Sequence, residues 1–130
     1  MHENDISSKI IGCAIEVHRQ LGPGLLESVY EEAICFELAR AGLRFRRQIQ
    51  VPIKYKAVLL ESPLRLDVIV EGKVIVDNKS KSEIHPIDKQ KLLTYLRLMD
   101  VHLGIIINFN VPKLVDGVSR VVNKLSEEAT

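Results

Sequence analysis

The sequence predicts a mixed α/β domain in which helices cover a sheet, and three observations lead to this fold class. First, apolar residues recur at helical spacing in four separate segments. Second, two apolar runs rich in β-branched residues, 64–70 and 74–76, flank the short turn Glu71, Gly72 and Lys73, which is the pattern of a β-hairpin. Third, the largely apolar segment 103–109 is typical of a strand buried on both faces.

The helices are expected at both ends of the chain and between the strands. The first spans residues 5–20 and the second spans 27–40, with Gly42 as the left-handed residue after its last turn. A third helix covers residues 87–99. The final segment, 112–125, has the spacing of an amphipathic helix.

The strands are expected to form a three-stranded antiparallel meander, with a buried fourth strand after the third helix. A long first strand covers residues 43–55, and Pro52 within it indicates a sheet edge or a bulge. A turn at residues 62–63 leads into the hairpin. Because nothing divides the 130 residues, we expect one domain, 1–130.

Composition and charge narrow the class of protein. Hydrophobic residues make up 46% and charged residues 27% of the chain, which is ordinary for a soluble globular protein. No apolar run is long enough to span a bilayer, so no membrane partner is expected. The start of the chain lacks the features of a signal peptide, and we expect a cytoplasmic protein. A net charge of +1 offers no global field for a polyanion.

The length of the hairpin loop decides which charges face each other. A three-residue loop pairs Val70 with Val74, so Asp67 lies opposite Asp77 on the same face; a two-residue loop would turn Asp67 away. We predict the three-residue loop, with positive φ at Gly72 or its neighbour. Like charges directly opposite one another are destabilising, and such a pair therefore indicates a bound cation.

Strand periodicity also puts Lys79 on the face of Asp77, two residues earlier. These three charged residues have two interpretations. One is a salt-bridged group on a solvent-facing side of the sheet. The other is a site for a hard cation such as Mg²⁺ or Mn²⁺, with the peptide carbonyl of Asn78 as an additional ligand.

The order Asp67, then Asp77, one residue, and Lys79 on a hairpin resembles the PD-(D/E)XK nuclease-like superfamily. That superfamily has a similar element order, so the resemblance implies a restriction-endonuclease-like core. More narrowly, Gly24, Glu27 and Tyr30 match the signature of the bacterial GxxExxY proteins. The resemblance covers roughly residues 5–123.

The resemblance implies a metal-dependent nuclease that hydrolyses nucleic-acid phosphodiesters with Mg²⁺ or Mn²⁺. Its ligands would be Glu27, Asp67 and Asp77 with Asn78, and Lys79 would be the catalytic cation. Without the resemblance, Glu27 is explained by the helix dipole, which favours an acidic residue in the first turn. Tyr30 is expected to be a packed aromatic residue that fixes this helix.

Three departures from the family pattern support an alternative. Asp77 stands where Glu is more usual, Asn78 where an apolar residue is usual, and Lys91 where Gln is typical. The alternative is a catalytically weakened or inactive nuclease fold that binds nucleic acid or a protein partner. Lys91 itself has three interpretations: a phosphate-binding cation, an ion-pair partner of Asp67 or Asp77 in place of the metal, or a solvated side chain.

Local clusters of basic residues are the expected contacts for nucleic acid. Lys81, Lys89 and Lys91 form such a patch with Lys79. The low aromatic content of 5% leaves few platforms on which single strands could stack. A second cluster is either another basic surface or the usual protection of an edge strand against aggregation: Arg44, Arg46, Arg47, Lys54 and Lys56. A homodimer through the edge strand or the last helix is a third, structural interpretation.

Overall fold

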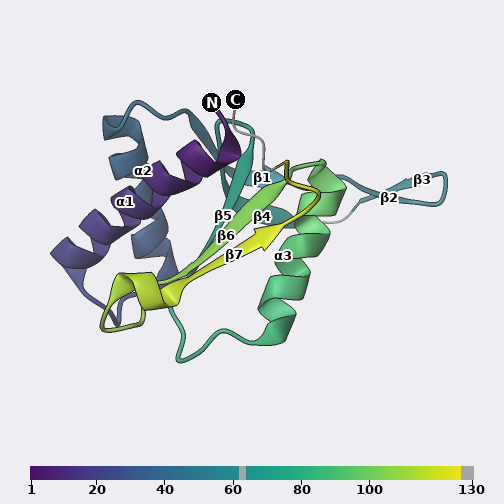
Figure 1. Cartoon of the computed structure of the whole chain (residues 1–130). Helices are drawn as coiled ribbons and strands as arrows, with labels where there is room; N and C mark the ends of the chain where they lie inside the picture. The colour runs from purple at the N-terminus through teal and green to yellow at the C-terminus, as the bar shows by residue number, and fades with distance from the viewer. Residues whose placement is uncertain (62–63, 127–130) are drawn as a thin grey trace.

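A five-stranded mixed sheet forms the centre of the fold (Figure 1). The computed structural model describes residues 1–61 and 64–126. In spatial order the strands are β1 (Phe45–Gln50), β4 (Arg65–Val70), β5 (Val74–Lys79), β6 (Leu103–Asn108) and β7 (Val118–Val122). Strands β5 and β6 are parallel, and the other neighbours are antiparallel. The predicted fold class, a mixed sheet flanked by helices, is confirmed.

Two layers of helices cover the two faces of the sheet. Helices α1 (Glu3–Leu21) and α2 (Glu27–Arg40) pack on one face, and α3 (Pro86–Met99) packs on the other (Figure 1). Each layer has its own apolar core: Val74 and Val76 point toward α1 and α2, whereas Ile75 points toward α3. In the described part of the chain, no helix is both long and apolar enough to cross a membrane.

The helix boundaries follow from capping groups. Helix α2 begins at Glu27 and ends before Gly42, whose φ of 79° lets the Leu43 N–H bond back to the Leu38 carbonyl, as predicted. Helix α1 begins earlier than the predicted residue 5, because the His2 side chain caps it by accepting a hydrogen bond from the Asn4 N–H.

The β4–β5 hairpin has the predicted three-residue loop. Val70 pairs with Val74 and Val68 with Val76, and the Lys73 N–H donates to the Val70 carbonyl at 3.0 Å. Both Glu71 and Gly72 have positive φ, 55° and 66°. The register that the charges depend on is therefore confirmed.

The long first strand predicted at 43–55 is wrong. Strand β1 ends at Gln50, and the chain then forms a separate two-stranded hairpin of β2 (Ile53–Tyr55) and β3 (Val58–Leu60). Pro52 interrupts the strand because it has no N–H for a ladder, and the Val51 N–H bonds to the Leu64 carbonyl instead. The turn predicted at residues 62–63 lies outside the described residues.

The final helix predicted at 112–125 is also wrong. This segment forms a short 3-10 helix, η1 (Leu114–Gly117), followed by strand β7. Strand β7 is rich in β-branched valine, and its backbone satisfies the hydrogen-bonding groups along β6, so sheet pairing outweighs the helical spacing. A homodimer through a last helix therefore has no such helix to use.

Candidate active site

The sequence-predicted acidic residues and Lys79 meet in one pocket of about 150 Å³. Asp67 comes from β4, Asp77 and Lys79 come from β5, and Glu27 comes from the first turn of α2. Helix α3 closes the other side of the pocket. The remaining lining residues are Arg65, Leu66, Ile75, Val76, Lys91, Leu92 and Tyr95.

Asp67 lies where both of its neighbouring strands depart from regular pairing. The Asn78 N–H of β5 donates to the Asp67 carboxylate Oδ2 at 3.3 Å. On the other side, Gln48 of β1 has a φ of 50°, between the regular pairs of Arg47 with Val68 and Ile49 with Leu66. A left-handed residue within a strand is strained, and such strain is concentrated at functional sites.

Burial and mutual repulsion make the three carboxylates hard to ionise. Burial, together with the nearby Asp77 and Glu31 carboxylates, raises the pKa of Asp67 to about 7. Burial also raises the pKa of Asp77, against the opposing effect of Lys79. The pKa of Glu27 is raised by burial too, and Asp77 adds to this effect. A cation in the pocket would relieve this repulsion.

Lys79 supplies one positive charge to the pocket. Its Nζ lies 3.4 Å from the Asp77 Oδ1. Burial alone would lower the pKa of Lys79, but the Asp77 and Glu27 carboxylates outweigh that effect and raise it. Lys79 is therefore a cation within the pocket, and it neutralises only part of the acidic charge there.

The loop before α2 is held by Tyr30, which brings Glu27 to the pocket. The Tyr30 hydroxyl donates to the Gly22 carbonyl at 2.6 Å and accepts from the Leu25 N–H at 3.1 Å. Its ring is fully buried and stacks on Phe109, with centroids 4.4 Å apart. The Ser80 hydroxyl, next to Lys79, donates to the Leu25 carbonyl. Tyr30 is thus the packed aromatic residue that the sequence predicts.

A comparison with protein families identifies the group to which this fold and site belong. The model of the PD-(D/E)XK nuclease superfamily matches residues 4–121, which is most of the chain. The chain belongs to the PD-(D/E)XK nuclease superfamily. Searches of curated proteins and of solved structures gave no match.

The three basic residues predicted beside the PD-(D/E)XK motif differ in their surroundings. Lys91 lines the pocket, weakly favours the ionised form of Asp77, and has its Nζ 5.8 Å from the Tyr95 ring centroid. The Lys81 Nζ donates to the Asp88 carboxylate at 2.8 Å, so its charge is already paired. Lys89 is exposed on the first turn of α3.

Sequence reasoning missed a buried group that joins α2 to β1. The Glu31 carboxylate is 8% exposed and accepts hydrogen bonds from Arg47 and from the Gln48 side chain. These bonds hold the strained Gln48 beside Asp67. The available signal was the position of Glu31 four residues after Glu27, which puts both carboxylates on one face of the helix.

The fit of a metal ion can be tested on the donor atoms. All candidate ligands are oxygens, which Mg²⁺ and Mn²⁺ prefer. Within the described ranges, however, no three acidic, His or Cys side chains are gathered closely enough to hold a metal as they lie. The donor chemistry therefore fits, and binding requires the carboxylates to turn toward a common point.

Proposed function

We propose that this protein is a metal-dependent nuclease that hydrolyses nucleic-acid phosphodiesters with Mg²⁺ or Mn²⁺. The observation that carries this proposal is the convergence of four side chains from three elements on one pocket of a PD-(D/E)XK fold: Glu27, Asp67, Asp77 and Lys79. Three carboxylates with raised pKa values in one pocket are what a cation site would need.

Asp67, Asp77 and the backbone carbonyl of Asn78 are the proposed metal ligands, with Glu27 completing the acidic side of the site. The N–H and C=O of a strand residue point to the same neighbouring strand. Because the Asn78 N–H points at the Asp67 carboxylate, its carbonyl faces the same side. The buried amide side chain of Asn78 points elsewhere and is not a ligand in this proposal.

A bound Mg²⁺ or Mn²⁺ would polarise the phosphoryl oxygen and lower the pKa of a bound water. The chain's own contribution is positioning and charge. Asp67 and Asp77 would supply the negative charge that attracts the cation. Lys79, whose raised pKa keeps it protonated, would donate a hydrogen bond to the phosphoryl oxygen as negative charge develops there.

The test is a cleavage assay on labelled DNA and RNA with Mg²⁺ or Mn²⁺, paired with calorimetric measurement of metal binding. We expect Asp67→Ala and Asp77→Asn to lose metal binding and to reduce cleavage at least 100-fold. Lys79→Met should bind the metal and still cleave poorly, because it keeps the ligands. Asp116→Asn, at an exposed carboxylate in η1, is the matched control. Absence of metal binding at millimolar concentration, or cleavage that survives Asp67→Ala, would refute the proposal.

A second candidate function is a binding module that keeps the nuclease fold without turnover. The 3.4 Å pair between Lys79 and Asp77 favours it, because an ammonium in this position competes with a metal for the Asp77 carboxylate. This candidate predicts nucleic-acid binding that neither EDTA nor Asp77→Asn changes. Metal-dependent cleavage that disappears in Asp77→Asn would rule it out.

A further inference from the structure

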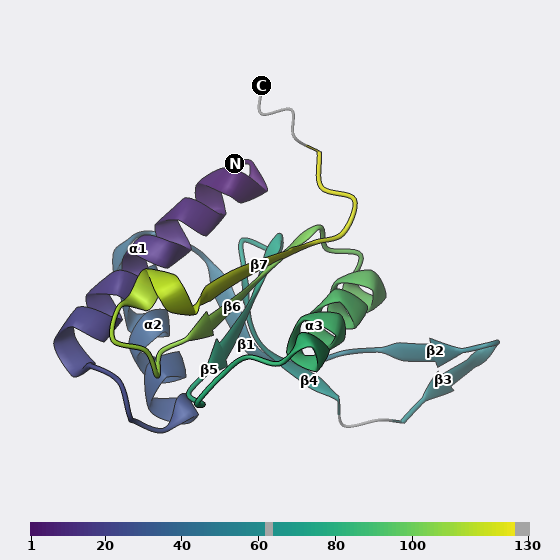
Figure 2. The ribbon, with the colours of Figure 1, turned by 60° about the horizontal axis from the view of Figure 1, so that its bottom comes forward.

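The β2–β3 hairpin projects away from the rest of the molecule, beyond α3 (Figures 1 and 2). It leaves the sheet at the end of β1, and the chain returns at the start of β4, two residues before Asp67. The hairpin is therefore rooted at the same end of the sheet as the candidate active site.

One face of this hairpin is apolar and exposed to solvent. The pairs Ile53 with Leu60 and Tyr55 with Val58 share that face, and Tyr55 and Val58 are 61% and 58% exposed. An isolated two-stranded hairpin in water is at best marginally stable. Its solvent-exposed apolar side chains form a surface that a binding partner could cover.

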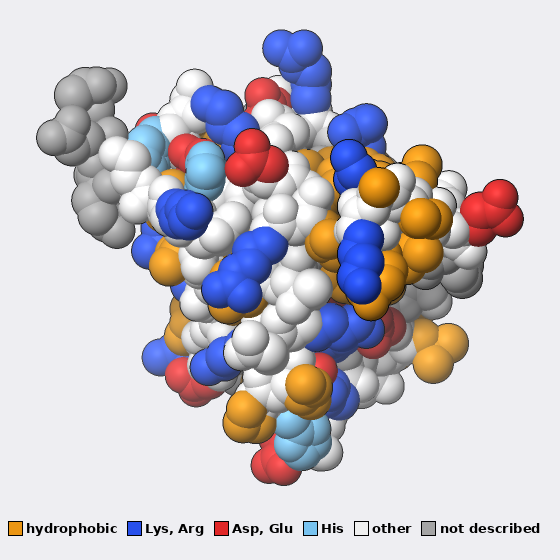
Figure 3. Space-filling view, turned by 90° about the vertical axis from the view of Figure 1, so that its right-hand side faces the viewer, with side chains coloured by type: hydrophobic (Ala, Val, Ile, Leu, Met, Phe, Trp, Pro, Cys, Tyr) orange, Lys and Arg blue, Asp and Glu red, His pale blue; other side chains and the backbone are white. Residues whose placement is uncertain are grey.

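The charge of the hairpin and its surroundings favours a polyanionic partner. Residues 43–66 contain six basic residues and one acidic residue, whereas the whole chain has a net charge of +1. Lys54 lies on the second face of the hairpin, and Lys56 is at its tip with Nζ 5.6 Å from the Tyr55 ring centroid. Figure 3, a view onto this side, shows Lys and Arg side chains over and around an apolar patch.

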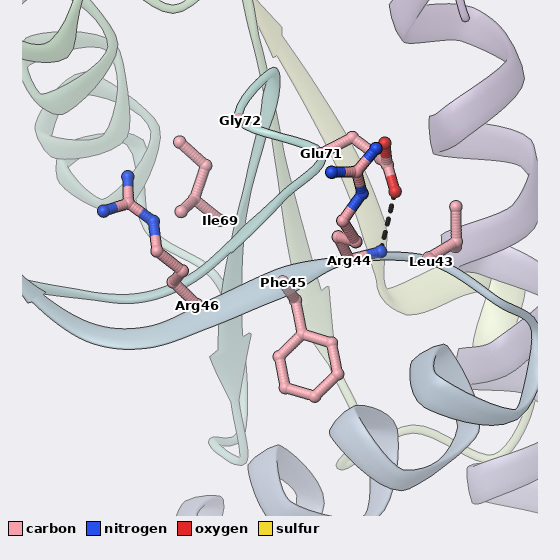
Figure 4. A pocket seen from close by; sticks show the side chains of 7 residues that line it. All are labelled: Leu43, Arg44, Phe45, Arg46, Ile69, Glu71 and Gly72. Carbon is pink, nitrogen blue, oxygen red and sulfur yellow. Dashed lines mark hydrogen bonds between the residues drawn. The ribbon is translucent and has the colours of Figure 1, made fainter.

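Further basic side chains lie at the two ends of the β1–β4 pairing. A hollow of about 590 Å³ is lined by Arg44, just before β1, by Arg46 and by Glu71. The two arginines point to the same side as Ile69, while Phe45 points away (Figure 4). At the other end, Arg65 lines the pocket that contains Asp67. Basic side chains thus lie on both sides of the candidate active site, at this hollow and at Arg65 beside the root of the hairpin.

We propose that the β2–β3 hairpin is an arm that enters a groove of duplex DNA, with Lys54 and Lys56 on the phosphates and Tyr55 against the groove wall. A two-stranded ribbon fits the major groove, which is about 12 Å wide. A second copy of this chain is a poorer occupant, because it would bring two sets of lysines together. This proposal rests on the proposed nuclease function, since the arm would hold the duplex beside the pocket.

The test measures affinity of the full chain for a fluorescent DNA duplex of about 20 base pairs by anisotropy, in EDTA and over a range of salt concentrations. Each phosphate contact contributes about 0.9 to the slope of log affinity against log salt. In the double variant Lys54→Ala with Lys56→Ala, the magnitude of that slope should therefore fall by about 1.8. Tyr55→Ala should weaken binding with the slope unchanged, because it removes no charge.

The matched control is Lys9→Ala with Lys113→Ala, two exposed lysines on the α1 and η1 side of the molecule, and it should keep the full salt slope. The proposal would be overturned if the Lys54→Ala, Lys56→Ala variant kept the full salt slope. It would also be overturned by a dimer in sedimentation that Val58→Asp dissociates while DNA affinity stays unchanged, because the hairpin would then be a protein interface.

Cleavage, measured separately with Mg²⁺ or Mn²⁺, distinguishes failure of the arm from failure of the nuclease. If the protein cleaves DNA but the Lys54→Ala, Lys56→Ala variant keeps the full salt slope of DNA binding, the hairpin proposal alone is refuted. If the protein does not cleave DNA but the variant loses salt slope in DNA binding, the nuclease proposal is refuted and the hairpin proposal is supported.

Discussion

At the residue scale, the Asp67 carboxylate is the clearest case of a side chain that costs stability. It is half-buried among other acidic groups, and its pKa is raised to about 7 by burial and by Asp77. A carboxyl whose pKa is higher in the folded state binds its proton more tightly there than in the unfolded chain. The stabilisation that comes from this tighter proton binding is therefore present below about pH 4, and it is lost as pH rises through about 7.

We expect Asp67→Asn, in buffer without divalent cations, to raise the free energy of unfolding more at pH 8 than at pH 5. The difference should be on the order of 1 kcal/mol, since one pKa unit corresponds to about 1.4 kcal/mol and solvent screens part of the effect. Urea denaturation at the two pH values measures it. Asp116→Asn, whose carboxylate is exposed, should show no such difference.

Two buried asparagines on neighbouring strands provide a second prediction. Asn78 is fully buried, and its amide N and O have no hydrogen-bond partner among the described residues. Asn108, on β6, bonds through its amide to both the N–H and the carbonyl of Lys81. We expect Asn78→Val to increase stability by about 1 kcal/mol, because burying an unsatisfied amide is costly.

The matched change Asn108→Val should decrease stability by about 2 kcal/mol, since it leaves the Lys81 backbone groups unpaired. Chemical denaturation of both variants against the original chain measures these effects. A loss of stability in Asn78→Val would contradict the argument and show that its amide has a partner.

At the scale of elements, close packing of backbone explains how the segment after β6 is arranged. A Cβ on Gly117, at the end of η1, would lie 2.1 Å from the Asn108 carbonyl oxygen. Only glycine allows this approach, and the approach sets the start of β7. The helical spacing of residues 112–125 contains no information about this backbone contact.

We expect Gly117→Ala to destabilise the protein by about 2–3 kcal/mol, because a backbone atom must shift to relieve the overlap. Gly12→Ala is the opposite case: it lies within α1, it is exposed, and nothing lies within 4 Å of its would-be Cβ. That change should stabilise the protein by about 0.5–1 kcal/mol. Thermal unfolding of both variants measures these effects. Equal changes in stability would contradict the packing argument.

At the scale of the whole molecule, the site exists only because each of the two helical layers brings a side chain to the same end of the sheet. Glu27 reaches it from one layer and Lys91 from the other, with the β4 and β5 carboxylates between them. A cation held by the β4 and β5 carboxylates, with Glu27 nearby, should stabilise the whole fold because these groups come together only in the folded state. The effect is about 2.7 kcal/mol at a cation concentration 100 times its dissociation constant.

We therefore expect Mg²⁺ or Mn²⁺ to raise the unfolding temperature of the protein, measured by calorimetric or optical melting. Asp77→Asn should abolish the increase, because it removes one of the proposed ligands. Asp116→Asn should preserve it. An equal increase in both variants would show that the cation binds outside the pocket.

Elements with local signals could be predicted from the amino-acid sequence. The three-residue turn with positive φ, the register of β4 with β5, and α2 with Gly42 depend on residues close together in the chain. The periodicity of apolar residues and the identity of the turn residues are sufficient to predict these features. The superfamily was likewise recognisable from the spacing of Asp67, Asp77 and Lys79, and the family comparison confirms the superfamily.

The other features depend on contacts between segments that are distant in the sequence. Strand β7 forms because β6 offers backbone partners, and β1 ends because the chain at Pro52 leaves the sheet for the projecting hairpin. Packing also decides that Lys81 pairs with Asp88 and Glu31 with Arg47. It leaves the Asn78 amide without a hydrogen-bond partner among the residues that the structure describes. The physical reason is that backbone pairing and burial depend on residues distant in sequence, so no local period encodes them.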